Sequence, residues 1–296
     1  MKKITKLITL FLCCILNATG CTDKKDDSIA TGKAGELSWV ISEDSVLTIS
    51  GKGDMPDYID ISHGIGTTPR EYIYNAPWPS TITAVVINDG VTSIGGCAFL
   101  GCSRLTSVTI SNSVTYIGES AFRECSGLTS ITLPNSVTSI GVGAFTECSG
   151  LTSITIPNSV TSLGNSTFRK CSGLTSVTIS NSLTSIDYGS FMYCTGLISV
   201  TIPNSVTYIG ANAFASCSEL LSVTVPSSVT EIDYNAFTYC SSLAEIINYR
   251  EIPQNLSLPV FNFINDECIL FVPSGSEDAY RAAERWEYFK TIKAIQ

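Results

Sequence analysis

Histidine is almost absent from this sequence, because His63 is the only one in 296 residues. A Ser-His-Asp or Cys-His nucleophilic site would have to use it, yet no serine or cysteine motif frames it. A glycine-rich phosphate loop, a calcium-binding loop and a cluster of metal ligands are also missing from the sequence. Paired carboxylates can act without histidine, but the acidic residues here are sparse and scattered. We therefore expect a protein that is not an enzyme and that holds no metal or cofactor.

An apolar run long enough to cross a membrane is missing too. The run from Leu7 to Leu16 has ten residues, whereas a membrane-spanning helix needs about 20. It follows the basic start MKKITK, which predicts a signal peptide over residues 1–20. The small residues directly before Cys21 resemble the lipobox of bacterial lipoproteins, in which the cysteine after the cleavage site is lipidated. A plain secreted protein cut near Gly20 is the alternative.

The segment after Cys21 bears on where the protein is located. The letters KKDD (Lys24 to Asp27) resemble a signal that carries some lipoproteins of Gram-negative bacteria to the cell surface. Together with a lipidated Cys21, this resemblance implies a protein anchored by lipid in the outer membrane and facing outward.

Basic residues are few. The chain has a formal net charge of −9, with 17 Lys and Arg against 26 Asp and Glu. Removal of residues 1–20 would delete three lysines and no acids, which takes −9 to −12. Phosphate backbones and anionic headgroups repel such a chain. We therefore expect no nucleic-acid partner, and attachment to the membrane by lipid alone.

A 23-residue repeat fills the middle of the chain, and no insertion interrupts it between Ile82 and Leu243. Three residue types keep this interval. They are Phe99, Phe122, Phe145, Phe168, Phe191, Phe214 and Phe237; Cys102, Cys125, Cys148, Cys171, Cys194, Cys217 and Cys240; and Leu105, Leu128, Leu151, Leu174, Leu197, Leu220 and Leu243. A period of 20–29 residues with L-x-x-I-x-I segments indicates a leucine-rich-repeat solenoid, because each unit buries its apolar face only against its neighbours.

Each repeat predicts the same local structures. In LTSVTI (Leu105 to Ile110), the apolar positions should face inward and Ser107 and Thr109 outward, which gives one strand of a parallel ladder. Eight such strands would form a sheet about 35 Å long. A recurring glycine, with aspartate as its substitute, predicts positive φ there. These residues are Gly95, Gly118, Gly141, Gly164 and Gly210, with Asp187 and Asp233. The following AF and cysteine predict a short helical or 3₁₀ turn.

The cysteines require a separate interpretation. Besides Cys21, nine cysteines follow the predicted signal peptide, namely the seven of the repeat, Cys97 and Cys268. An odd number cannot all pair, and an interval of 23 residues differs from the close CxxC pairs of zinc sites. Buried, reduced thiols are therefore favoured. Scattered disulfides between neighbouring turns remain the alternative in an oxidising compartment.

The two ends of the solenoid predict caps. Leu37, Trp39 and Ile41 alternate with polar residues, as do Leu47 and Ile49, which indicates a β-hairpin. Residues 59–76 predict an exposed loop. At the other end, CILFVPSG is typical of a degenerate repeat strand. SEDAYRAAERWEYFK predicts a helix that begins near Ser276 and carries Tyr280, Ala283 and Trp286 on one face.

The repeat SVTSIGxxAFxxCSGLTSITIPN, the entry LSWVISEDSVLTISGKGDMPDY…APW and the exit VPSGSEDAYRAAERWEYF resemble the BspA-like leucine-rich-repeat proteins. The resemblance runs from about Gly35 to the C-terminus. It implies a bacterial surface protein that binds host or bacterial proteins or glycans in adhesion and colonisation. A surface glycan-binding accessory or structural protein of an uptake system is the alternative.

Two surfaces are candidates for ligand binding. One is the outward threonine row of the strands, namely Thr109, Thr132, Thr155, Thr178, Thr201 and Thr224, although β propensity alone also explains threonine there. The other is the edge just before each cysteine, where the repeats differ and where Arg123, Arg169, Tyr193 and Tyr239 stand. Arg and Tyr are favoured at protein interfaces, but drift on a free surface gives the same pattern. The sequence does not decide between them.

The predicted fold class is an α+β repeat solenoid, with a parallel β ladder of 23-residue period, an N-terminal β-hairpin cap and a C-terminal helical cap. The predicted divisions are a signal peptide (1–20), a linker (21–34), a β cap with its loop (35–81), the leucine-rich repeats (82–248), and a degenerate repeat with the helical cap (249–296).

Overall fold

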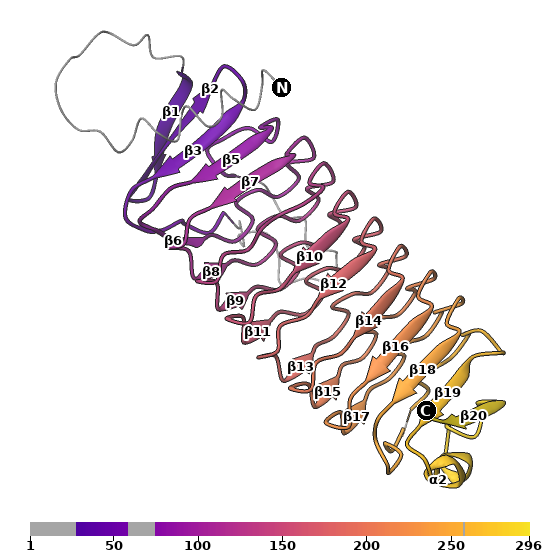
Figure 1. Ribbon diagram of the computed structural model, residues 1–296. Coiled ribbons are helices and arrows are strands. Elements are labelled where there is room, and N and C mark those ends of the chain that lie inside the picture. The colour runs from indigo at the N-terminus through magenta and orange to yellow at the C-terminus, as the bar shows by residue number, and fades with distance from the viewer. Residues whose placement is uncertain (1–27, 59–74, 257) are drawn as a thin grey trace, which may run out of the picture.

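The computed structural model describes residues 28–58, 75–256 and 258–296. The predicted signal peptide, Cys21, His63 and most of the predicted loop at 59–76 lie outside these residues. The described chain forms an elongated solenoid in which successive repeats stack side by side from the N-terminal to the C-terminal end (Figure 1). Almost all of its regular structure is β, so the expectation of an α+β fold is wrong in its helical part.

The first parallel ladder runs along one side of the solenoid. Partners along it are one repeat apart, as in the pairs Ser153–Ser176 and Val200–Val223. Residues 128–133 make no regular strand, although the N–H of Thr152 still donates to the Thr129 carbonyl at 3.1 Å. Its strands are β3 (Val46–Ser50), β5 (Ala84–Ile87), β7 (Ser107–Ile110), β10 (Ser153–Thr155), β12 (Ser176–Thr178), β14 (Ser199–Thr201), β16 (Ser222–Val225), β18 (Glu245–Asn248), β19 (Ile269–Val272) and β20 (Thr291–Ala294).

A second ladder of shorter strands follows the turn that ends each strand of the first. Each of its strands from β8 onward places one apolar residue, such as Ile117 or Ile140, in the core. Its strands are β4 (Gly53–Asp54), β6 (Val91–Ile94), β8 (Tyr116–Ile117), β9 (Ser139–Ile140), β11 (Ser162–Leu163), β13 (Ser185–Ile186), β15 (Tyr208–Ile209) and β17 (Glu231–Ile232).

The third side of each repeat differs from the predicted helical or 3₁₀ turn. Alternate N–H groups bond within the repeat and to the next repeat. The N–H of Leu100 donates to Cys97 O at 3.2 Å, whereas the N–H of Phe99 donates to Ala121 O at 2.8 Å. This alternation prevents a continuous helix, because half of the donors point along the solenoid axis. The side is therefore a series of tight turns that are bonded to one another.

The reason for the recurring glycines differs from the predicted positive φ. None of the five, and neither aspartate that replaces them, has positive φ. A Cβ on Gly118 would lie 2.5 Å from the Gly96 nitrogen, and one on Gly141 would lie 2.6 Å from the Glu119 nitrogen. At Gly118 and Gly141 the neighbouring backbone approaches too closely for a side chain, whereas Asp187 and Asp233 take the equivalent position in two later repeats. Positive φ occurs instead at other positions of the repeat, including the residue before each cysteine, such as Glu124 (φ 63°) and Lys170 (φ 60°).

This distinction predicts two different alanine effects. Gly141→Ala should lower the free energy of unfolding by about 3 kcal/mol, because backbone blocks the new methyl. Gly101→Ala should cost only about 1 kcal/mol, because Gly101 has a φ of 70° but open space around its Cβ position. Urea unfolding followed by circular dichroism measures both. The reverse order of the two costs would contradict close approach as the reason for the glycine.

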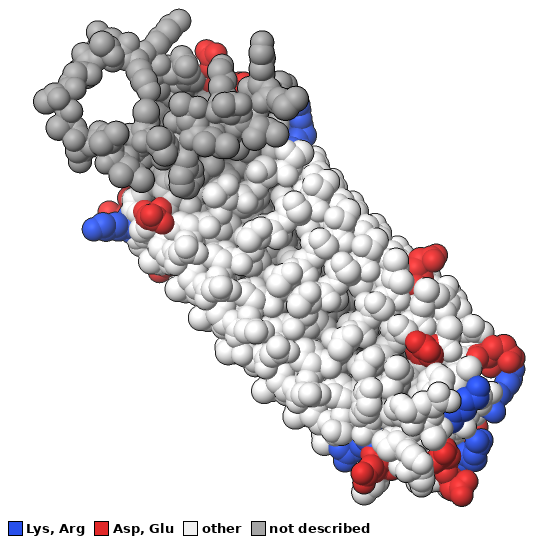
Figure 2. Space-filling model, in the orientation of Figure 1, with Lys and Arg blue, Asp and Glu red and all other residues white. Residues whose placement is uncertain are grey.

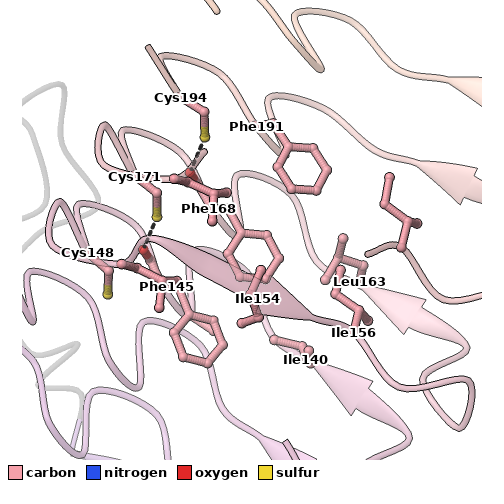
Figure 3. Close-up of a cluster of buried hydrophobic side chains, with 14 of the residues drawn as sticks. Ile140, Phe145, Cys148, Ile154, Ile156, Leu163, Phe168, Cys171, Phe191 and Cys194 are labelled. Carbon is pink, nitrogen blue, oxygen red and sulfur yellow. Dashed lines mark hydrogen bonds between the residues drawn. The ribbon is translucent and has the colours of Figure 1, made fainter. Parts of the chain in front are cut away.

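The core contains a stack of phenylalanine rings from the repeats. Neighbouring rings lie nearly parallel, for example Phe145 and Phe168 with centroids 5.5 Å apart and planes at 7° (Figure 3). The stack continues through Phe261, and tryptophans close it, with Trp78 against Phe99 and Trp286 against Phe261. All seven repeat phenylalanines are fully buried. The stack therefore links every repeat to both caps, and we name it the aromatic column.

A column of buried thiols runs beside these rings, as predicted. All nine cysteines of the described residues are buried thiols. The Cys171 thiol donates to Phe145 O at 3.1 Å and the Cys194 thiol to Phe168 O at 3.1 Å (Figure 3). Burial raises the pKa of Cys148 and of Cys240 to about 12. The thiols therefore stay protonated and act as small apolar groups with one weak donor.

The N-terminal cap contains the predicted hairpin. β2 (Leu37–Ser42) and β3 pair antiparallel, and all five predicted apolar residues are buried. The structure adds β1 (Ser28–Ala34), which pairs antiparallel with β2 in a segment that the sequence assigned to the linker. Trp78 closes the aromatic column here, with Trp39 and Tyr58 packed edge-on against it. The cap therefore begins earlier than the predicted Gly35.

The C-terminal cap differs more from its prediction. The predicted degenerate repeat strand is present as β19, but the helix α2 (Glu277–Ala282) has only six residues. Ala283 is already extended, with φ −82° and ψ 133°, and Trp286 is buried from a turn. The chain then adds β20, which pairs parallel with β19. The cap is therefore mostly β.

A buried polar cluster fastens this cap to the last repeat. The Asn248 amide donates to Gln254 Oε1 at 2.9 Å, and the Gln254 amide donates to Val229 O at 3.1 Å. The Trp286 indole N–H donates to Gln254 O at 2.9 Å. Tyr280 donates to Arg250 O at 2.8 Å. These bonds satisfy polar groups that the apolar core would otherwise leave unpaired.

Candidate functional site

The outward threonine row lies on the surface of the first ladder, as predicted. Its threonines are exposed, except Thr224, which is half-buried, and a serine stands two residues before each of them. From Ser107 to Thr224, the outward residues at these two positions carry no charge. Figure 2, in the orientation of Figure 1, shows that the middle of this face is almost without Lys, Arg, Asp or Glu. We call these two rows, which run from Ser107 to Thr224, the Ser/Thr face.

The hydroxyl groups separate this row from two other threonine rows. Thr138 donates to Thr115 O at 3.2 Å, and Thr207 donates to Thr184 O at 3.2 Å, so these hydroxyls bind neighbouring repeats together. Thr152 does the same to Thr129 O at 3.2 Å. No hydroxyl of the row from Thr109 to Thr224 hydrogen-bonds another described residue. The fold therefore does not use the hydroxyl groups of the threonines in the Ser/Thr face.

The second candidate surface, the edge before each cysteine, carries charged and aromatic side chains in contact. Arg169 lies over the Tyr193 ring at 5.9 Å, which is a cation–π geometry. Lys170 bonds Glu147 of the preceding repeat at 2.7 Å. Arg123 pairs with its neighbour Glu124 at 3.1 Å. The structure thus brings Arg169 and Tyr193 together, whereas Arg123 and Tyr239 lie elsewhere along the same edge.

The backbone of this edge is strained wherever the residue before the cysteine is not glycine. Gly101 occupies the position in the first repeat, with a φ of 70°. Later repeats place Glu147 (φ 63°), Tyr193 (φ 62°) and Tyr239 (φ 58°) there. Bulky residues adopt this conformation at a cost and cluster at ligand clamps and other functional positions. The Lys170–Glu147 ion pair also lowers the pKa of Glu147, chiefly through the hydrogen bond from Lys170.

Sequence reasoning missed that this edge continues into the C-terminal cap. Tyr239 stacks on Phe263 with centroids 4.6 Å apart and planes at 8°. Phe263 also has positive φ, at 58°. It is 24 residues after Tyr239 rather than 23, and isoleucine rather than cysteine directly follows it, so the repeat pattern does not reveal it. The only signal in the sequence was an unexplained aromatic in NFIND.

No group of three His, Cys, Asp or Glu residues in the described ranges, 28–58, 75–256 and 258–296, is placed to hold a metal ion. The helices of the same ranges include none with the length and hydrophobicity that a membrane crossing requires.

A parallel solenoid with a 23-residue period, an inward leucine, phenylalanine and cysteine in each turn, and β caps defines a leucine-rich-repeat protein. The family model for the BspA type leucine rich repeat region matches residues 78–198 and 119–244, with six copies. The chain belongs to this family, whose repeats generally mediate protein interactions.

Several solved structures are similar to the chain. A leucine-rich repeat protein from Bacteroides ovatus is 22% identical, with a TM-score of 0.48, and the match covers 93% of this chain and 82% of that chain. One from Eubacterium ventriosum is 22% identical, with a TM-score of 0.47 and coverage of 90% and 84%. The leucine-rich repeat protein of T. pallidum is 26% identical, with a TM-score of 0.44 and coverage of 77% and 85%. A comparison with curated proteins finds no significant match.

Proposed function

We propose that this protein is a lipid-anchored protein of the outer cell surface that binds an extended polypeptide or glycan through its Ser/Thr face, in adhesion or colonisation. The observation that carries the proposal is the set of outward threonine hydroxyls that the fold leaves unused. The lipid anchor rests on the sequence around Cys21.

The chemistry of the face suits a neutral, extended ligand. Strands of the ladder repeat at about 4.8 Å, so one hydroxyl-bearing row presents donors and acceptors at regular intervals. Peptide groups and sugar hydroxyls offer the matching neutral partners. An uncharged face also avoids the desolvation cost that buried charges carry. Many weak bonds along one line then add up to useful affinity, although each contributes only about 1 kcal/mol.

A comparison of two triple variants tests the proposal. Thr155→Val, Thr178→Val and Thr201→Val together should keep the stability, because their hydroxyls bond no described residue, and should weaken ligand binding at least tenfold. Thr138→Val, Thr207→Val and Thr230→Val together should lower stability, because their hydroxyls donate to the preceding repeat, and should leave binding unchanged.

Binding is measured by surface plasmon resonance of the purified protein on immobilised matrix proteins, mucins and neutral polysaccharides, and stability by urea unfolding. Saturable binding that only the first triple variant weakens supports the Ser/Thr face. Equal loss in both variants, or no saturable binding anywhere on the panel, overturns the proposal.

A further inference from the structure

A cavity of about 420 Å³ lies at the C-terminal end, between residues 259–268 and residues 285–290. This volume falls in the range of small-ligand sites, about 300–1,000 Å³. The cavity belongs to the cap and not to the Ser/Thr face, so an inference about it does not depend on that face.

Four aromatic side chains line the cavity. Phe263 and Tyr288 both line it and are 66% and 75% exposed. Tyr239 covers one face of the Phe263 ring in a nearly parallel stack. Phe261 and Phe289, which also line the cavity, meet edge-to-face at 5.3 Å. Two large exposed rings at one cavity form an apolar wall that the fold has not buried.

The backbone adds an independent argument. Phe263 holds a positive φ of 58° at the position that Gly101 fills without strain in the first repeat. A bulky residue in this conformation costs energy, and the stack on Tyr239 offsets only part of it. Folding alone would favour glycine there. An aromatic ring at this position is therefore explained better by a ligand that the ring contacts.

Both basic side chains of the lining have an acidic partner beside the cavity. Lys290 pairs with Glu267 at 3.1 Å, which raises the pKa of Lys290, and Arg285 pairs with Glu284 at 3.4 Å. Asn265 uses its Oδ1 atom to accept the Glu267 N–H at 3.0 Å, and its amide N–H₂ bonds no described residue. Asn262 and Asp266 complete this side of the cavity. The lining therefore offers amide and carboxylate groups beside aromatic rings, without an uncompensated cation that would select an anion.

We infer that this cavity binds a neutral hexopyranose unit of a glycan. One face of a pyranose ring carries C–H groups, whose weakly positive hydrogens suit the negative face of an aromatic ring. The hydroxyls at the ring edge suit the Asn265 amide and the Asp266 carboxylate. A purely apolar ligand would leave these polar groups unpaired, and an anionic ligand would face Asp266.

Affinity electrophoresis of the purified full chain, in gels that contain dextran, laminarin, galactomannan or mannan, tests the inference. We expect retardation by at least one of these neutral polysaccharides, at least tenfold weaker in Phe263→Ala and in Tyr288→Ala. Tyr249→Ala removes another exposed tyrosine that does not line the cavity, and should bind like wild type. The Thr155/Thr178/Thr201 triple variant should also bind like wild type, which separates this site from the Ser/Thr face.

Three outcomes would overturn the assignment. They are the absence of retardation by all four polysaccharides, retardation that both aromatic variants keep, and retardation that 0.5 M salt abolishes, since salt weakens ionic binding and not stacking. Tyr288 is 75% exposed, so its alanine variant retains the fold even if Phe263→Ala does not. Binding of an immobilised matrix protein that is lost in Tyr288→Ala, without polysaccharide binding, would assign the cavity to a protein ligand instead.

Discussion

Raising the pH from 8 to 10 is expected to remove roughly 8 kcal/mol from the free energy of unfolding. The cause is the set of six thiols that are fully buried and donate to phenylalanine carbonyls, namely Cys125, Cys148, Cys171, Cys194, Cys217 and Cys240. Burial raises the pKa of each from 9.0, to about 12 for Cys148 and Cys240. The effect approaches the whole stability of an ordinary domain, about 5–15 kcal/mol.

The sign of the effect follows from proton binding. Above pH 9 the unfolded chain releases these protons, whereas the folded chain keeps those of Cys148 and Cys240 until about pH 12. Burial raises the pKa of the other four thiols well above 9.0 in the folded chain too. The unfolded state then binds fewer protons, so stability falls as the pH rises. Each thiol contributes about 1.4 kcal/mol of this loss at pH 10. Below pH 9 the thiols are protonated in both states, and the stabilisation is fully present.

Urea unfolding followed by circular dichroism between pH 7 and pH 10.5, with a reducing agent present, measures this loss. Cys171→Ala is the matched control, because it removes one titrating group. Its stability at pH 7 should be lower, but its loss per pH unit above pH 9 should be smaller by about 1.4 kcal/mol. A stability that stays constant from pH 8 to pH 10.5 would contradict the protonated thiol column. So would an unchanged slope in the variant.

The parts of the fold that the sequence predicts are those that one repeat determines. Leu105, Val108 and Ile110 alternate with Ser107 and Thr109, and this period alone places the strand and its inward side. The seven phenylalanines and seven cysteines are buried because the same environment recurs every 23 residues. Stacking identical units then leaves only one register, which the pairing of Val200 with Val223 confirms.

Features that depend on the neighbouring backbone were not predictable in the same way. A glycine such as Gly141 is equally compatible with positive φ and with close approach, and only the position of the Glu119 nitrogen distinguishes them. Positive φ at Glu147 or Tyr193 could not be read from the sequence, because neither residue prefers that conformation. The alternating hydrogen bonds between repeats impose it.

The predicted length of the helix in the C-terminal cap was wrong for a related reason. Tyr280, Ala283 and Trp286 are spaced by three residues, which fits one face of a helix. The same spacing also fits a short helix followed by a turn, provided that both aromatics reach the core. Trp286 is buried because it closes the aromatic column and donates to Gln254 O. This tertiary contact overrides the helical pattern after Ala282.

The sequence predicted where the candidate binding residues lie, but not which of them keep a hydroxyl that the fold does not use. Thr109 and Thr138 are both exposed threonines of the repeats. Only the structure distinguishes them, because the Thr138 hydroxyl binds Thr115 O and the Thr109 hydroxyl binds no described residue. The Phe263 and Tyr288 cavity was not predictable, since the degenerate repeat and the cap meet there without a periodic signal.

Phe168→Ala is expected to lower the free energy of unfolding by about 3–5 kcal/mol, the range of a phenylalanine deleted from a packed core. Phe168 stands near the middle of the aromatic column and contacts a ring on each side, Phe145 at 5.5 Å and Phe191 at 5.4 Å. Because each repeat is stabilised by its two neighbours, the cavity weakens two interfaces at once. The two halves of the solenoid should then unfold in separate steps.

Urea unfolding followed by circular dichroism tests for both the loss and the second step. Phe168→Leu fills most of the space and should cost only about 1.5 kcal/mol with a single transition. Tyr234→Ala, at an exposed side chain, should change stability by less than about 0.5 kcal/mol. If Phe168→Ala costs no more than Phe168→Leu, the ring stack does not connect the repeats. Cooperativity would then have to come from the two β ladders, whose hydrogen bonds the substitution leaves intact.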